Sequence, residues 1–203
     1  MKHAKKNHAM ISAAVLALVA AAAAACSSVA HTAAATTTSS PTSSPTSKGA
    51  PASLTDGSQV NSLLQSGLTQ AEKKNWSVAT TDFQKVLAIN SSNVYANYDL
   101  GWIAQSRGNS NDAISYYKKC LAANAAYTPA MYNEAILLET SNPQQAIAVY
   151  QKIVSIDPKA ATAYLRMALV QAEQGDMTAA KANDAKAVSI DHALSKYKLP
   201  AKN

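Results

Sequence analysis

The chain has 203 residues and a formal net charge of +6, from 18 Lys and Arg against 12 Asp and Glu. Lys2, Lys5 and Lys6 stand at its start and the other basic residues are scattered, so the charge pattern indicates no nucleic-acid partner. Two cysteines are too few for the disulfide framework that holds many small secreted domains together.

Residues 1–25 have the pattern of a secretory signal peptide. The early lysines are followed by an apolar run over residues 10–25. This run is shorter than the ~20 apolar residues that a membrane-spanning helix needs, and most of it is alanine. We therefore expect the segment to be removed from the mature protein and not to serve as an anchor.

The signal ends in a run of alanines followed by Cys26. Small residues directly before a cysteine resemble the signal of a bacterial lipoprotein, which implies that Cys26 carries a diacylglycerol. Two acyl chains anchor a protein stably without a spanning helix. The resemblance thus implies a lipid-anchored protein at the outer face of the cytoplasmic membrane. The alternative is ordinary cleavage after Ala30, since Ser28 and Ala30 are small residues at the required spacing, and it gives a secreted protein.

Residues 26–57 are dense in Ser, Thr, Ala and Pro and show no apolar periodicity. Such a segment cannot bury enough apolar surface to fold, so we predict a disordered tether. If Cys26 is lipidated, Cys120 is left alone. Its place in an apolar helical stripe predicts a buried structural thiol.

The folded part, residues 58–192, is organised around the unit at residues 94–127. This unit reads as two amphipathic helices joined by a turn at Gly108, a residue that takes the left-handed conformation at low cost. Ala113, Tyr117, Cys120 and Leu121 form an apolar stripe on the second helix. Gly101 in the first helix has no side chain, so a neighbouring helix can approach its backbone closely.

The unit recurs along the chain. Gly67, Ala79 and Phe83 precede Gly101, Ala113 and Tyr117 by 34 residues, and matching positions follow over residues 128–160 and 161–192. This spacing resembles the tetratricopeptide repeat. The resemblance implies an all-α, right-handed superhelical solenoid of about four helix-turn-helix repeats, at residues 60–93, 94–127, 128–160 and 161–192.

Two departures from the repeat are informative. The third repeat is one residue shorter and has Ser141-Asn142-Pro143 in place of the glycine turn, where Pro143 suits the first turn of a helix. The fourth repeat has Asp184 where the others have an aromatic ring. A terminal repeat needs a polar outer face, so we expect the array to end there, with residues 193–203 as a capping tail.

In tetratricopeptide folds the first helices of successive repeats line a concave groove that binds peptides. Matched by register, the groove residues are Asn61, Leu64, Gln65 and Leu68 in the first repeat, Tyr95, Tyr98, Asp99, Trp102 and Gln105 in the second, Tyr132, Asn133, Ile136 and Glu139 in the third, and Leu165, Arg166 and Leu169 in the fourth. This set is rich in aromatic and aliphatic residues, so it favours a hydrophobic helix or an extended peptide, with Tyr98 and Trp102 as anchors. Only Arg166, with Asn61 and Asn133, is suited to a ligand carboxylate. The competing interpretation is that much of this face packs against the second helices or the chain's own tail.

The sequence offers little to catalysis. Of the four histidines only His192 lies near the repeats, and there is no nucleophile paired with a base, no metal-ligand cluster and no phosphate-binding glycine loop. We therefore predict a non-catalytic protein-interaction module that needs no cofactor and has an unidentified protein partner. A module that binds envelope glycan or lipid is the alternative, because aromatic rings also stack on sugars.

Overall fold

The computed structural model describes residues 54–200, with side chains from residue 57 onward. The predicted signal peptide, Cys26 and almost all of the predicted tether lie outside this range. Residues Pro51–Asn203 form one compact unit. The first helix begins at Leu54, so the folded part starts slightly before the boundary at residue 57 that composition suggested.

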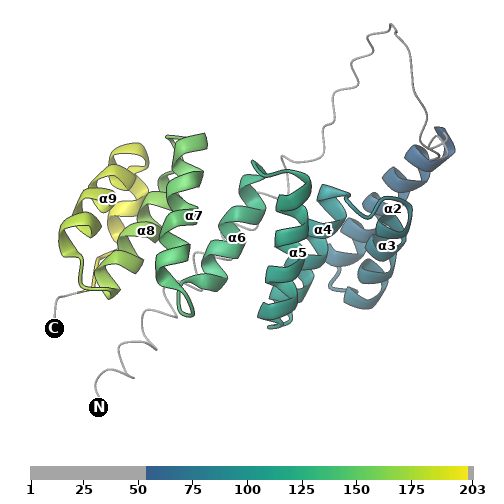
Figure 1. Ribbon diagram of the computed structural model, residues 1–203, viewed down its shortest axis with the longest axis horizontal. Helices are drawn as coiled ribbons and strands as arrows, with labels where there is room; N and C mark the ends of the chain where they lie inside the picture. Colours follow the sequence, from purple (N-terminus) through teal and green to yellow (C-terminus); the bar gives the residue numbers. More distant parts are fainter. Residues whose placement is uncertain (1–53, 201–203) are drawn as a thin grey trace, which may run out of the picture. The chain divides into compact units, whose positions relative to one another are not determined.

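Within residues 54–200 the fold consists of eight α-helices and one short 3-10 helix, with no strand (Figure 1). They are α2 (Leu54–Glu72), α3 (Trp76–Ile89), α4 (Val94–Ser106), α5 (Ser110–Ala123), α6 (Thr128–Leu138), α7 (Pro143–Ile156), α8 (Ala161–Glu173), α9 (Met177–Ile190) and η1 (His192–Lys196). The all-α prediction is confirmed. None of these helices is long and apolar enough to cross a lipid bilayer.

The helices pack as four antiparallel hairpins, each made of a first helix (α2, α4, α6, α8) and a second helix (α3, α5, α7, α9). Each second helix also contacts the first helix of the next hairpin, which joins the hairpins into a solenoid (Figure 1). Helices α4, α6 and α8 begin at Val94, Thr128 and Ala161, the residues where the repeats were predicted to begin. The predicted repeat architecture is confirmed.

Within the first two hairpins, an aromatic ring of the second helix lies on a glycine of the first. A Cβ atom added to Gly101 would lie 2.6 Å from Cε1 of Tyr117, and one added to Gly67 would lie 2.7 Å from Cε1 of Phe83. Both rings are fully buried. The predicted close approach at Gly101 is therefore present, and the ring of the second helix fills the space that a side chain would need.

The turns inside the hairpins are of two kinds. Gly108 and Gly175 have φ values of 79° and 84°, and Lys74, at the register of Gly108 in the first hairpin, has a φ of 60°. The third hairpin instead caps α7 with Asn142, whose side-chain oxygen accepts from the Gln145 amide, and places Pro143 as the first helical residue. The shorter turn thus starts a helix without a left-handed residue, as the sequence predicts.

Polar residues end the solenoid on both sides. On α2, Ser62, Ser66 and Thr69 are exposed at the register where α4 buries Ala96, Leu100 and Ile103 against the preceding hairpin. At the other end, Asp184 replaces the buried ring on α9, and η1 packs on α9 with its Leu194 buried. Neither end therefore presents the apolar surface that a further repeat would need.

We predict that Gly101→Ala destabilises the domain by about 1–3 kcal/mol, because the buried ring of Tyr117 must move to admit the methyl group. Urea unfolding of residues 51–203, followed by circular dichroism, measures the change. The matched control is Gly57→Ala in α2, where nothing lies within 4 Å of the added Cβ atom and stability should stay equal or rise slightly. Equal losses in both variants would contradict the close-packing argument.

Candidate peptide-binding face on the first helices

The sixteen positions matched by register fall on the first helices or at their C-terminal ends, but they differ in exposure. Asp99, Leu64, Leu165 and Arg166 are buried, so none of them presents its side chain to a ligand in this structure. Partly exposed are Leu68, Tyr95, Tyr98, Trp102, Gln105, Tyr132, Asn133, Ile136, Glu139 and Leu169, and fully exposed are Asn61 and Gln65. We call the partly exposed residues Leu68, Tyr95, Tyr98, Trp102, Tyr132, Ile136 and Leu169 the aromatic face.

The rings of the aromatic face are held by other rings behind them. Trp102 meets Trp76 edge-on, with ring centroids 5.6 Å apart and planes at 67°. Tyr98 lies 5.3 Å from Tyr127 at 72° and 6.0 Å from Tyr117 at 39°. Edge-to-face pairs of this kind restrict how far a ring can turn. A ligand would therefore meet ring surfaces that are already positioned.

The same arrangement continues along the solenoid. Tyr95 lies 6.2 Å from Tyr127 at 85°, and Tyr132 lies 5.8 Å from Tyr150 at 67°. Thus part of each ring of the aromatic face is covered by α3, α5, α7 or the loop after α5, while the rest remains at the surface. The sequence allowed either an exposed groove face or a face packed within the repeats. The aromatic residues show features of both, because they pack inside the repeats and also retain exposed area.

Hydrogen bonds connect α4, α5 and α6 beside the aromatic face. The Tyr117 hydroxyl donates to Oε1 of Gln105 at 2.7 Å, and Nδ2 of Asn133 approaches the hydroxyls of Tyr117 and Tyr98 at 3.3 and 3.4 Å. Asn133, predicted to contact a ligand, therefore also links two hairpins. Its amide positions the Tyr98 ring that it neighbours.

Arg166 is committed to an internal ion pair. Its Nε and Nη2 donate to the two carboxylate oxygens of Glu139 at 2.8 and 2.6 Å, and the Tyr150 hydroxyl donates to the same carboxylate at 2.7 Å. Arg166 is 1% exposed. Burial raises the pKa of Glu139 above its ordinary value although Arg166 and Tyr150 favour the charged form. Arg166 is therefore not free to bind a ligand carboxylate, and Glu139 is the residue that prevents it.

Asp99 lies inside the solenoid and not on the groove surface that its register indicated. Burial raises its pKa from 3.8 to about 7, and its Oδ2 has no hydrogen-bond partner among the described residues. The residue lies close enough to Tyr117, Tyr127 and Cys120 to raise their pKa values further, after burial itself. Sequence reasoning missed this because a polar residue at a groove register is normally expected at the surface.

The charge of the first helices follows from these contacts. Arg166 is the one basic residue within α2, α4, α6 and α8, and Glu139 neutralises it. The same helices carry acidic residues, among them Glu72 and Glu173 at exposed ends. A ligand of the aromatic face thus meets no free cation from these four helices.

The remaining candidates for chemistry are few. Cys120 is a free, buried thiol, as predicted, and burial raises its pKa to about 12, so it is held in the unreactive protonated form. Over residues 57–200 no group of three or more His, Cys, Asp or Glu side chains is arranged to hold a metal ion. Nothing in this part of the chain adds a catalytic candidate to those that the sequence offered.

Comparison with known proteins agrees with this architecture. The family model described as the tetratricopeptide repeat matches residues 94–127, which are α4, α5 and the loop that follows them. Residues 94–127 therefore match one tetratricopeptide repeat. No curated protein matches the chain by sequence. The other hairpins share the register of the matched repeat, so the whole solenoid is a tetratricopeptide-repeat fold, as the sequence resemblance implied.

Solved structures with similar folds are distant in sequence. The crystal structure of MamA matches with a TM-score of 0.63 and 24% identity, over 70% of this chain and 84% of that one. YrrB, described as a TPR protein with an unusual peptide-binding site, matches with a TM-score of 0.59 and 22% identity, over 70% of this chain and 74% of that one. A Thermobaculum terrenum O-GlcNAc transferase mutant matches with a TM-score of 0.60 and 16% identity, over 68% of this chain but 27% of its own. At these identities the comparisons show a shared fold.

We predict that Asp99→Asn changes how stability depends on pH. The pKa of Asp99 is higher in the folded than in the unfolded chain, so the folded state binds more protons and the wild-type domain loses stability as pH rises from about 4 to about 7. The variant should lose this component of the slope and be more stable above pH 7, by on the order of 4 kcal/mol. Unfolding free energies measured across pH 4–8 provide the test.

Glu134 and Glu139 also have raised pKa values and contribute to the same slope, so the comparison uses the difference between variant and wild type. Asp112→Asn, at an exposed carboxyl group on α5, is the matched control and should follow the wild-type profile. A constant offset between Asp99→Asn and wild type at every pH would show that Asp99 does not titrate in this window.

Proposed function

We propose that the solenoid is a non-catalytic protein-interaction module whose aromatic face binds an apolar peptide segment that is uncharged or basic. The observation that carries this proposal is the set of partly exposed, pre-positioned rings at Tyr95, Tyr98, Trp102 and Tyr132 on successive first helices. Rigid aromatic side chains supply a large contact area at a small loss of conformational entropy, and they dominate many peptide and protein interfaces.

The preference for an uncharged or basic ligand follows from the first helices. Arg166 is held by Glu139, and the helices otherwise carry carboxylates. A peptide carboxylate placed against the aromatic face would lose its water and gain no cation from these four helices in exchange, which is unfavourable. A backbone amide or a lysine tip meets no such penalty. The peptide-binding site of YrrB, on the same fold, supports a peptide as the ligand class.

The decisive experiment is crosslinking capture from an envelope extract with residues 51–203. We expect the wild-type domain to capture a protein from the extract. The Tyr98→Ala, Trp102→Ala double variant should capture at least about tenfold less of that protein, since two anchor rings are removed. Tyr116→Ala is the matched control, because it truncates a half-buried ring on the second helix α5. Circular dichroism first establishes that all three proteins remain helical.

Loss of the same protein from the Tyr116→Ala control, or its retention by the double variant, would contradict the aromatic face as the binding site. Retention of an extract component that survives protease treatment would favour the glycan alternative. Synthetic peptides that differ in one charge then test the second part of the proposal. A peptide with an added acidic residue should bind more weakly than its neutral and basic counterparts.

We also propose that the module is held at the outer face of the cytoplasmic membrane by a diacylglycerol on Cys26. Its support is the sequence pattern of basic residues, apolar run and alanines directly before the cysteine. Cys26→Ser should abolish incorporation of labelled palmitate and move the protein from the membrane fraction to the soluble fraction. A mature protein that begins at His31 and carries no lipid would establish the secreted alternative instead.

A further inference from the structure

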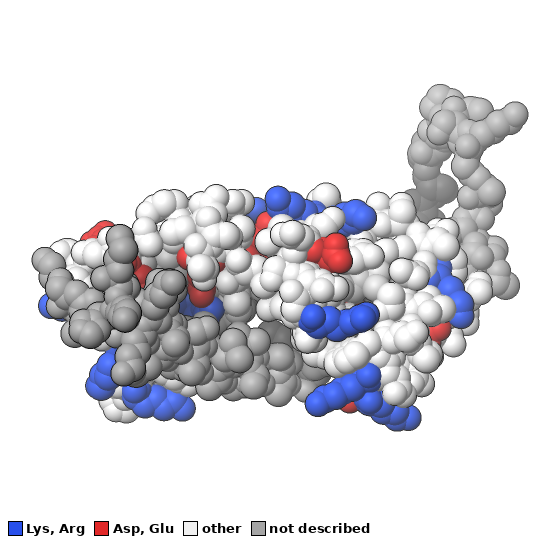
Figure 2. Space-filling model, turned by 90° about the horizontal axis from the view of Figure 1, so that it is seen from below, with Lys and Arg blue, Asp and Glu red and all other residues white. Residues whose placement is uncertain are grey.

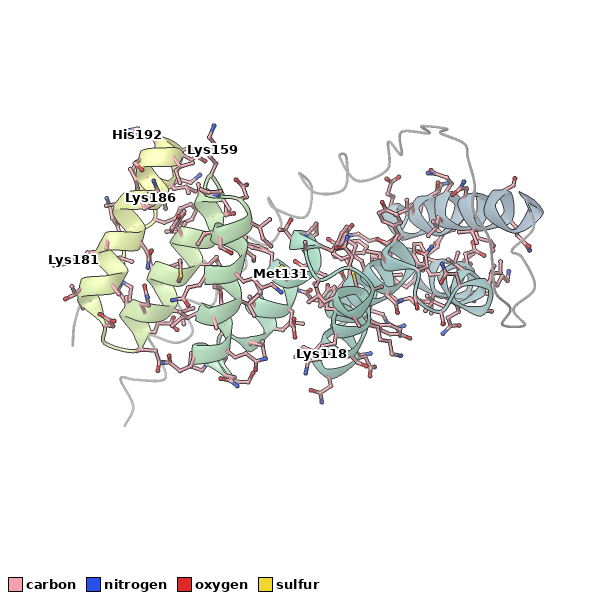
Figure 3. The ribbon with its side chains drawn as sticks, turned by 45° about the horizontal axis from the view of Figure 1, so that its top comes forward. Lys118, Met131, Lys159, Lys181, Lys186 and His192 are labelled. Atoms are coloured by element: carbon pink, nitrogen blue, oxygen red, sulfur yellow. The ribbon has the colours of Figure 1, made fainter. Side chains whose placement is uncertain are left out.

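The second helices carry a row of lysines in one register. Lys85, Lys119, Lys152 and Lys186 occupy the same position in α3, α5, α7 and α9, and all four are exposed. Each directly precedes a buried core residue, namely Val86, Cys120, Ile153 and Ala187. Two more exposed lysines, Lys118 and Lys181, lie on α5 and α9 and reach the periphery of the solenoid in Figure 3. The second helices thus contribute six lysines to the surface.

These lysines have few acidic partners. Lys118 lies close enough to Glu134 of α6 to lower the pKa of that carboxyl group against the larger effect of burial. Among the described residues the one ion pair on the second helices joins Lys85 to Asp82 at 3.5 Å, and Asp82 is buried and also accepts from Ser66 at 2.6 Å. Of the other two carboxylates on these helices, Asp184 is half-buried and Asp112, in the first turn of α5, is exposed. Figure 2 shows Lys and Arg side chains interspersed with Asp and Glu side chains on the face that it displays.

Exposed aliphatic residues accompany the lysines. Val78, Ile89 and Ile156 are the large hydrophobic residues with high exposure in the described part of the chain, at 49%, 39% and 44%, and all three belong to second helices. Ile89 follows Lys85 by four residues on α3, and Ile156 follows Lys152 by four residues on α7. Residues four apart share a helix face, so each isoleucine lies beside a lysine.

The helix dipole does not account for this pattern. None of Lys85, Lys119, Lys152 and Lys186 lies in the last turn of its helix, where the dipole would stabilise a positive charge. Nor does the dipole explain Lys181, which lies in the first half of α9, or the exposed isoleucines, which would be more stable if buried. Lysines beside exposed aliphatic residues on one side of a helix are typical of surfaces that lie against anionic lipid.

We infer that the outer side of the second helices is a docking surface for an anionic phospholipid membrane. The lysine ammonium groups contact lipid phosphates, and the side chains of Val78, Ile89 and Ile156 enter the interface. The isoleucines favour a membrane over a soluble polyanion, because a soluble polyanion offers no apolar phase to receive them. The surface lies on the helices opposite those of the proposed peptide site, and it does not depend on that site or on Cys26.

The test uses residues 51–203, a compact unit whose core clusters are formed by its own helices and which contains neither Cys26 nor the signal. Co-sedimentation is measured with vesicles of phosphatidylglycerol and phosphatidylcholine in equal parts, and with phosphatidylcholine alone. We expect binding to the anionic vesicles, none to the neutral ones, and a steep loss with added salt. Absence of binding to anionic vesicles at low salt would overturn the inference.

The triple variant Lys119→Gln, Lys152→Gln, Lys186→Gln should bind anionic vesicles roughly 100-fold more weakly, from the contribution of each lysine near a charged membrane. Lys73→Gln, Lys159→Gln, Lys198→Gln removes the same charge from loops and the tail and should change binding by less than about threefold. Equal weakening in the two triple variants would show attraction by net charge and not by this surface.

The aliphatic residues are tested separately. Ile89→Ser, Ile156→Ser leaves every charge in place and removes exposed side chains, so the fold should persist, and binding to anionic vesicles should weaken several-fold. Binding that is unchanged in this variant but abolished by soluble polyphosphate would overturn the membrane as the partner and point to a soluble polyanion.

Discussion

In the first three hairpins a buried aromatic ring of the second helix packs against a small residue of the first helix, and this contact sets the spacing of the two helices. With Tyr117 on Gly101 and Phe83 on Gly67, the two helices of the first and second hairpins approach more closely than a side chain at the glycine would permit. That spacing buries the ring completely and directs the opposite side of the first helix outward. The third hairpin keeps a buried ring, Tyr150, with Ala135 in place of the glycine, and the fourth hairpin has neither ring nor glycine, with Asp184 and Ala168 at these positions.

The same ring position also joins one hairpin to the next when the ring is tyrosine. The hydroxyl of Tyr117 connects Gln105 of α4 with Asn133 of α6, and the hydroxyl of Tyr150 reaches Glu139, which holds Arg166 of α8. These hydrogen bonds link α4 to α6 and α6 to α8, in addition to the apolar core that the hairpins share. They also remove the one cation from the first helices, so the contact that orders the aromatic face restricts the charge of its ligand.

The sequence predicted the repeats, the hairpin turns and the buried thiol because each depends on local spacing. The roles of Gly101, Pro143 and Cys120 could be predicted from the position of each residue within its own repeat. The site was less predictable, since exposure depends on side chains from other repeats. Arg166 and Asp99 have groove registers, yet Glu139 from the preceding hairpin draws Arg166 inward, and Asp99 is enclosed without any cation. The spacing of residues within one repeat predicts neither the ion pair of Arg166 with Glu139 nor the burial of Asp99.

The division of charge between the two sets of helices has a physical consequence for how the module can work. First helices hold carboxylates and one neutralised arginine, whereas second helices expose six lysines. A basic peptide and an anionic membrane would therefore be drawn to different sides of the same solenoid, so neither would compete with the other for its surface. Attraction of the second helices to the membrane would also turn the aromatic face away from the lipid and toward partners in the envelope. A solenoid suits this arrangement because the outward-facing residues of its two helix sets can change independently, as long as the residues packed between the helices are retained.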